Sequence, residues 1–206
     1  MHVFSHAPTR RATLAAAALT LGAAGCGEQT TSFDPVALET QLASGDLDDR
    51  CAGALGGESV DAVVVPEGST CTLTATRVQG DIRVEPGATF TADGIWVEGN
   101  VQAQGQAAIS LLGGSVVRGD VQIQQGGDTH VEGAVIGGNL QVQQNTGHVH
   151  LSANRVDGHV QANQNLGGLV IEDNQIAKEL QCEGNDPPPT GGGNVADDKK
   201  KQCEEV

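Results

Sequence analysis

Histidine and aspartate residues concentrate in one short part of the chain. Asp128 and His130 alternate with residues expected to face inward, and His148 and His150 repeat that alternation twenty residues later. If the two segments are adjacent parallel strands, His130 stacks on His150 and Asp128 on His148 at about 5 Å. Imidazole and carboxylate groups at that separation are ligands for Zn²⁺ or Cu²⁺, although a flat strand face supplies poor tetrahedral geometry. The sequence therefore offers these four residues as a candidate surface metal site, with a solvent-facing cluster that binds nothing as the alternative.

Glutamine recurs at positions expected on the outer face of neighbouring strands. The residues concerned are Gln102, Gln104, Gln122, Gln124, Gln141, Gln143 and Gln161. Amide side chains stacked on successive strands hydrogen-bond to one another as a ladder. The same flat polar face could instead bind a glycan or a protein partner, so it is the largest candidate binding surface in the sequence.

Carboxylates are spaced poorly for the hydrolysis of a glycan. Asp81, Asp120 and Glu179 share one repeat position but lie two or three repeats apart, which is roughly 10–15 Å or more. Glycoside hydrolysis needs two carboxyl groups flanking the scissile bond. Trp96 is the only tryptophan and there is no tyrosine, so aromatic platforms for sugars are scarce. The sequence favours a non-catalytic protein, with a carbohydrate-active protein (polysaccharide binding, lyase or hydrolase) as the alternative.

A repeat with a period of 19 or 20 residues positions these side chains. Its units start at Val78, Val97, Val117, Ile136, Val156 and Ile176. Apolar or small residues follow four and six positions after each start, which is the alternation of a strand with one buried face. Glycine stands two positions after five of the six starts and marks a corner. Nine positions after the starts, where we expect a bend with left-handed backbone, stand Gly87, Gln106, Gly126, Asn145, Asn165 and Asn185.

A period near 20 residues predicts a solenoid, because each unit is too short to bury a core alone. Three strand-like runs per unit predict an all-β, single-stranded parallel β-helix over residues 51–185, with about 6–7 coils of 19–20 residues. Parallel crossovers are right-handed by strong default. Left-handed hexapeptide solenoids resemble a stricter coil, so the right-handed form is expected here.

Residues 1–25 have the features of an export signal rather than of folded structure. Arg10 and Arg11 precede an apolar stretch that is too short to remain as a membrane span. The arginine pair resembles a twin-arginine signal, and the ordinary secretion route is the alternative.

The segment Ala23-Ala24-Gly25-Cys26 resembles the lipobox of bacterial lipoproteins, although Ala23 stands where leucine is usual. The resemblance implies a lipid on Cys26, contact with a membrane through that lipid, and a place in the bacterial cell envelope. Residues 26–50 would then be a flexible tether. The alternative is a plain secretory signal with a chance cysteine.

Four cysteines remain once Cys26 is set aside. Cys71 and Cys182 lie on inward positions of the first and last coils, at the two ends of the apolar core. An exported protein can keep disulfides, and we predict the pairs Cys51–Cys71 and Cys182–Cys203, each stabilising by about 2–4 kcal/mol. Residues 186–206 are rich in proline, glycine and charge, and Cys203 would hold them as a strap over the end of the rod.

The C-terminal part of the chain resembles a known group of proteins. Leu180-Gln181-Cys182-Glu183-Gly184-Asn185, the prolines that follow, Gly191-Gly192-Gly193-Asn194 and Gln202-Cys203 are similar to the ending of uncharacterised exported bacterial parallel β-helix repeat proteins. The resemblance covers the repeats and the tail. It implies the fold and export, and it implies no catalytic residue.

Charge narrows the classes of partner. Removal of residues 1–25 leaves nine basic against 26 acidic residues, a formal charge of −17. So acidic a surface repels nucleic acid. The sequence therefore predicts a non-catalytic extracytoplasmic lipoprotein without an obligatory cofactor. It would act as a surface scaffold or binding module for an envelope glycan or protein.

Overall fold

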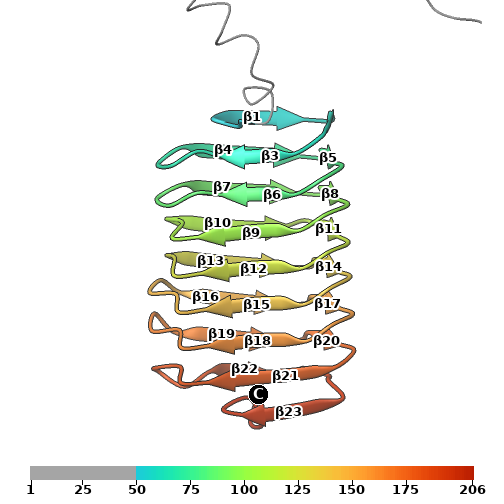
Figure 1. Ribbon diagram of the computed structural model, residues 1–206. Coiled ribbons are helices and arrows are strands. Elements are labelled where there is room, and N and C mark those ends of the chain that lie inside the picture. Colours follow the sequence, from blue (N-terminus) through green and yellow to red (C-terminus); the bar gives the residue numbers. More distant parts are fainter. Residues whose placement is uncertain (1–49) are drawn as a thin grey trace, which may run out of the picture. The chain divides into compact units, whose positions relative to one another are not determined.

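A computed structural model describes residues 50–206, which form an all-β parallel solenoid (Figure 1). The predicted export signal, Cys26 and nearly all of the predicted tether lie outside the described residues. Followed from its N-terminal end in Figure 1, the front strands run to the left and the strands behind them run to the right as the chain descends. The solenoid is therefore right-handed, as predicted.

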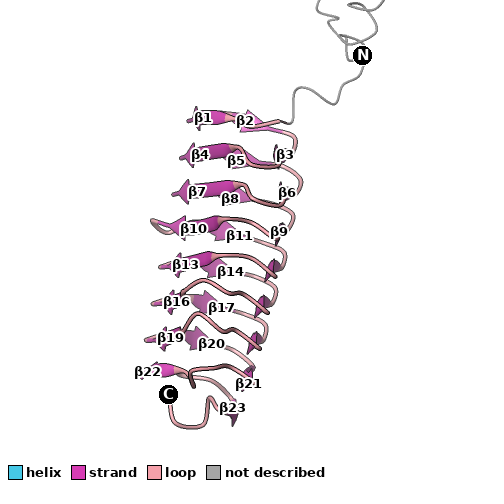
Figure 2. Cartoon of the chain, turned by 90° about the vertical axis from the view of Figure 1, so that its left-hand side faces the viewer, coloured by secondary structure: helices cyan, strands magenta, loops and turns pink. Residues whose placement is uncertain are grey.

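Three parallel sheets form the sides of the solenoid, and Figure 2 shows them edge-on. We name them after their outward residues or strand length. The histidine sheet contains β1 (Gly53–Gly56), β4 (Thr70–Thr74), β7 (Thr89–Asp93), β10 (Ala108–Leu112), β13 (Asp128–Glu132), β16 (Val149–Ser152), β19 (Leu169–Glu172) and β22 (Thr190–Gly192). The short-strand sheet contains β2 (Ser59–Val60), β5 (Arg77–Val78), β8 (Trp96–Val97), β11 (Val116–Val117), β14 (Val135–Ile136), β17 (Arg155–Val156) and β20 (Gln175–Ile176). The amide sheet contains β3 (Val63–Val65), β6 (Ile82–Val84), β9 (Val101–Gln104), β12 (Val121–Gln124), β15 (Leu140–Gln143), β18 (Val160–Asn163), β21 (Glu179–Glu183) and β23 (Asp198–Lys201).

The core is a set of vertical columns of aliphatic side chains. All six predicted repeat starts are buried, with exposed fractions of at most 5%. In the amide sheet, Val121 lies in register between Val101 and Leu140. Constant coil length keeps like residues in register, so each apolar side chain packs on the equivalent side chain of the next coil. This arrangement confirms the predicted strand alternation.

Glycine at the first corner is required by close approach of successive coils. A Cβ atom on Gly119 would lie 2.6 Å from the carbonyl oxygen of Gly99. Any larger residue would therefore push two coils apart.

The second bend differs from the prediction by one residue. Gly87 has a φ of 69° as expected, but in later coils the left-handed residues are Gly105, Gln125, Gln144 and Gln164, with φ values from 56° to 68°. The residues that follow them, including Asn145 and Asn165, turn their side chains into the core. The physical reason is that asparagine is used here for hydrogen bonding between coils and not for its tolerance of the left-handed region.

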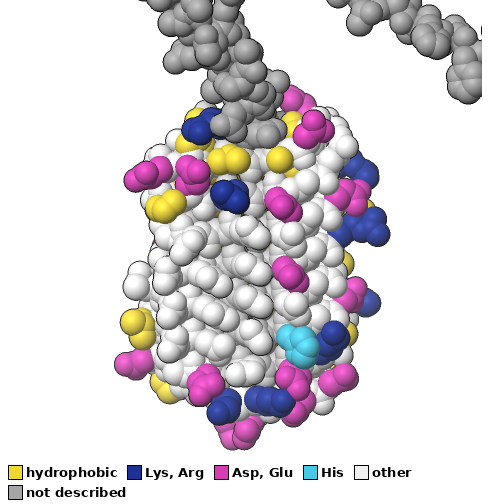
Figure 3. All heavy atoms as spheres, viewed as in Figure 1, with side chains coloured by type: hydrophobic (Ala, Val, Ile, Leu, Met, Phe, Trp, Pro, Cys, Tyr) yellow, Lys and Arg dark blue, Asp and Glu magenta, His cyan; other side chains and the backbone are white. Residues whose placement is uncertain are grey.

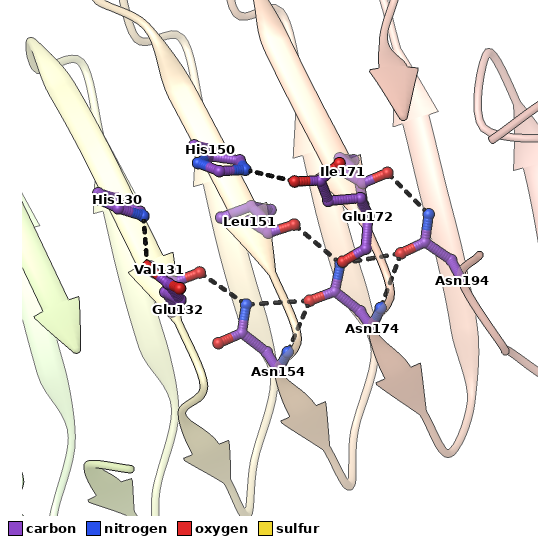
Figure 4. A network of polar contacts seen from close by, with 10 residues as sticks. All are labelled: His130, Val131, Glu132, His150, Leu151, Asn154, Ile171, Glu172, Asn174 and Asn194. Carbon is purple, nitrogen blue, oxygen red and sulfur yellow. Dashed lines mark hydrogen bonds and ion pairs between the residues drawn. The ribbon is translucent and has the colours of Figure 1, made fainter. Parts of the chain in front are cut away.

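Two columns of buried asparagine connect the C-terminal coils. One contains Asn145, Asn165 and Asn185, and the other contains Asn154, Asn174 and Asn194 (Figure 4). The Oδ1 atom of Asn165 accepts hydrogen bonds from the backbone N–H of Asn145 at 3.1 Å and from its Nδ2 at 3.0 Å. Each side chain also donates to a backbone carbonyl, so these buried polar groups are satisfied. We call these columns the asparagine ladders.

Both ends of the solenoid extend further than predicted. Two sheets have eight strands and the third has seven, which exceeds the 6–7 coils expected. At the C-terminal end, residues 186–206 contribute β22 and β23, which pair with β19 and β21 and continue the coil rather than lie across it. Disulfides join Cys51 to Cys71 and Cys182 to Cys203, the pairing expected from the sequence.

Candidate functional site

The predicted glutamine surface forms one continuous face of the amide sheet. Gln102, Gln122, Gln141 and Gln161 stack in register, and beside them stack Gln104, Gln124, Gln143 and Asn163. Gln125, Gln144 and Gln164 follow at the adjoining bend. We call these eleven side chains the amide face. In Figure 3 its centre is free of charged and hydrophobic side chains, which gather at both ends and along one edge.

Hydrogen bonds within the amide face run along the bend and not along the predicted stacks. The Nε2 atom of Gln104 donates to Oε1 of Gln125 at 3.2 Å, and the same contact continues to Gln144 and Gln164. The left-handed backbone at Gln125 and its successors aims their side chains along the axis of the solenoid. Within residues 50–206, the carboxamides of Gln102 and Gln122 hydrogen-bond to no other protein group, so they are available to a ligand.

A shallow groove of about 400 Å³ lies at the N-terminal end of the amide face. Its polar and cyclic lining residues are Arg83, Pro86, Gln102, Gln104, Gln122 and Gln124. The groove therefore combines one cation with carboxamides that offer both donors and acceptors.

Charged pairs occupy the opposite end of the amide face. The Lys200 ammonium donates a 2.6 Å hydrogen bond to Glu179, and Lys201 lies 3.6 Å from Glu183. The hydrogen bond from Lys200 holds the pKa of Glu179 below its ordinary value, and the same contact raises the pKa of Lys200. Each charge at this end is thus matched by one of the opposite sign.

The predicted histidine stack is present on the outer face of the histidine sheet. The rings of His130 and His150 are stacked with centroids 5.0 Å apart. The Nε2 atom of His150 lies 3.0 Å from Oε1 of Glu172, in a hydrogen bond (Figure 4). Nε2 of His130 lies 3.1 Å from Oε2 of Glu132, at an ion-pair separation without hydrogen-bond alignment. Both imidazoles are thus engaged by carboxylates that the sequence reasoning did not include.

The four candidate metal ligands border one hollow but do not form a coordination site. Asp128 lies beside His148, yet its Oδ1 atom accepts a 2.9 Å hydrogen bond from the backbone N–H of His148. Among residues 50–206, no group of three or more histidine, cysteine, aspartate or glutamate side chains is arranged to hold a metal ion. The flat strand face is the reason, because it keeps the rings parallel instead of converging on one point.

The carboxylates considered for catalysis serve the first corner of the coil. Asp81 accepts hydrogen bonds from the backbone N–H of Asn100 at 2.7 Å and from its Nδ2 at 3.0 Å. Asn100 in turn accepts from the backbone N–H of Asp120, and Asp120 accepts from Asn139. Aspartate and asparagine therefore alternate along this corner as links between coils.

A cluster around Trp96 was missed by the sequence reasoning. The Trp96 side chain is 38% exposed, and its indole N–H donates to Glu98 at 3.0 Å. Arg118 lies 3.3 Å from the same carboxylate, Arg77 also contacts it, and the Arg77 guanidinium stands 5.7 Å from the centre of the indole ring. The indole hydrogen bond, reinforced by both arginines, lowers the pKa of Glu98. A signal was available, because Trp96 precedes the buried Val97 and must therefore face outward.

Comparison with models of known protein families, with curated proteins and with solved structures gives no match. The part of the chain that the structure describes contains no helix with the length and apolarity needed to cross a membrane.

Proposed function

We propose that the protein is a non-catalytic surface scaffold or binding module of the bacterial cell envelope, held to a membrane by a lipid on Cys26, and that its amide face binds a glycan. One observation carries the proposal. The centre of the amide face over β9, β12, β15 and β18 is free of charge, in a chain whose formal net charge is −15.

Carboxamides suit the hydroxyl groups of a sugar, because each offers two N–H donors and a carbonyl acceptor. The in-register stacks repeat this pattern once per coil, at about 4.8 Å. A polymer with a regular repeat can therefore make the same contacts on several coils. Long, mobile glutamine side chains lose rotamer freedom on binding, so we expect weak contacts that add up along a chain rather than one tight pocket.

The proposed location rests on separate observations. Two disulfides hint at an oxidising, extracytoplasmic compartment. The lipid anchor rests on the sequence around Cys26 alone. Metabolic labelling with a fatty acid tests it: the wild-type chain should take up label and Cys26→Ser should not. Equal labelling of both chains would refute the anchor.

A glycan array tests the binding proposal. The full chain is applied to neutral and acidic glycans, and each ligand found is titrated by calorimetry. Gln122→Glu combined with Gln141→Glu removes N–H donors and adds charge, so we expect at least about a tenfold loss of affinity. The control is Thr72→Ala with Thr91→Ala, which alters outward residues in register on the histidine sheet.

Two outcomes would overturn the proposal. If no glycan binds, or if the control variant loses as much affinity as the amide-face variant, the amide face is not a glycan site. If the bound glycan is shortened during incubation, the carbohydrate-active alternative replaces a non-catalytic module.

A further inference from the structure

Arg83 is the one cation on the lining of the groove at the N-terminal end of the amide face. It occupies the position in β6 that corresponds to Gln102 in β9, so it heads a column of glutamines. Its own side chain is exposed. Among the described residues, the arginines in ion pairs are Arg77, Arg118 and Arg155, and Arg83 has no such partner.

The surroundings of Arg83 leave its charge uncompensated. Its two cross-strand neighbours are Val64 and Gln102, and neither carries a charge. Glu85 is the nearest acid along the strand, but its Oε2 atom accepts a 3.1 Å hydrogen bond from the backbone N–H of Glu67 at the adjoining bend. Glu85 does not line the groove. The guanidinium is therefore free to take an anion from a ligand that lies in the groove.

A guanidinium presents its N–H donors in a plane that matches the two oxygens of a carboxylate. Below Arg83, the groove continues with the carboxamides of Gln102, Gln122 and Gln124. These groups suit hydroxyls and not a second anion. The groove thus offers one position for a carboxylate, followed by positions for neutral polar groups.

We infer that the preferred ligand of the groove is a glycan that carries a carboxylate, such as one uronic acid unit, with the carboxylate on Arg83 and the neighbouring hydroxyls on Gln102, Gln122 and Gln124. This inference rests on the proposed function of the amide face and names its substrate class. A polymer with an anion on every unit fits less well, because the formal charge of the whole chain is −15.

Matched pairs of oligosaccharides test the inference. Each pair has the same neutral backbone, with and without one uronic acid unit, and several backbones are compared on the full chain by calorimetry. We expect the acidic member of a pair to bind about tenfold more tightly at low salt, and the difference to shrink as salt is added. Arg83→Gln should abolish that preference while keeping the affinity for the neutral member.

A second arginine supplies the matched control. Arg155→Gln removes a charge on the short-strand sheet, where Arg155 pairs with Asp157 at 3.2 Å, and it should leave the preference unchanged. Circular dichroism of both variants confirms that each is folded before titration.

The outcomes separate this inference from the proposed function. If neutral and acidic members bind equally and Arg83→Gln changes nothing, the inference is wrong and the glycan-binding face stands. If no oligosaccharide of either kind binds, both fall. If a sulfated analogue binds as tightly as the carboxylated one, the groove selects charge alone, and the claim for a planar carboxylate is overturned.

Discussion

The asparagine ladders and the amide face use the same functional group for opposite ends. Asn165 is buried, and its carboxamide spends its donors and its acceptor on four hydrogen bonds to neighbouring coils. Gln122 is half-exposed and hydrogen-bonds to no other group within the described residues. The comparison teaches that a carboxamide stabilises this solenoid where it is enclosed and can bind a ligand where it is not.

The largest expected effect comes from removing an enclosed carboxamide. Asn165→Ala leaves the backbone and side chain of Asn145 and the carbonyl of Val142 without partners inside the core. Because unsatisfied buried groups cost about 1–3 kcal/mol each, we expect a loss of about 3–4 kcal/mol in the free energy of unfolding. Gln141→Ala on the amide face should change it by less than about 0.5 kcal/mol. Urea denaturation of both variants measures the difference, and equal effects would contradict the comparison.

A smaller effect tests where the first asparagine ladder ends. Gln106 occupies the ladder position two coils before Asn145, is buried, and has no hydrogen-bond partner for either side-chain polar atom in the described part. Its carboxamide fills the space beside Gly126, where a Cβ atom would lie 2.2 Å from the Gln106 side chain. We therefore expect Gly126→Asn alone to destabilise the protein.

Gly126→Asn combined with Gln106→Asn should instead extend the ladder and stabilise the protein by about 1 kcal/mol. The sign reversal between single and double variants is the diagnostic result. Thermal denaturation measures it, and a double variant no more stable than the single one would show that the ladder cannot be continued.

The smallest effect concerns the charged cluster at Trp96, as a contrast to the neutral amide face. The hydrogen bond from the indole, with Arg77 and Arg118, lowers the pKa of Glu98 below 4.5. The stabilisation from this cluster is therefore fully present above pH 4.5 and is lost as pH falls through the lowered pKa. Trp96 is the only tryptophan, so its fluorescence should titrate with a midpoint below 4.5.

Arg118→Gln should move that midpoint upward, while Arg155→Gln, on the same sheet but in a different ion pair, should not. A midpoint at or above 4.5 in the wild-type chain would remove the electrostatic account of the cluster.

Residue spacing was sufficient to predict the solenoid. A period of 19 or 20 residues, with apolar residues at fixed offsets, defines strands and buried columns without knowledge of the turns. It also placed His130 on His150, because register follows directly from coil length. Glu132 and Glu172 were missed as partners of the histidines, since the reach of a glutamate side chain cannot be read from register.

The bends were predicted less well because alternation stops there. Asparagine tolerates left-handed backbone and is also a compact hydrogen-bonding group, and spacing alone does not distinguish the two uses. In Asn145 and Asn165 the second use applies, and the adjacent Gln144 and Gln164 take the left-handed backbone instead. The groove at Arg83 was not predicted either, because it depends on side-chain shape along four strands.

The position of the asparagine ladders has a mechanical consequence. Both begin in the C-terminal half, whereas the equivalent positions in earlier coils hold residues such as Gly87, Ile95 and Ala134. Under tension between the two ends, coils near β1 would detach first and at lower force than those near β21. A load applied through the N-terminus would therefore unwind the rod in sequence from that side and leave the reinforced portion intact longest.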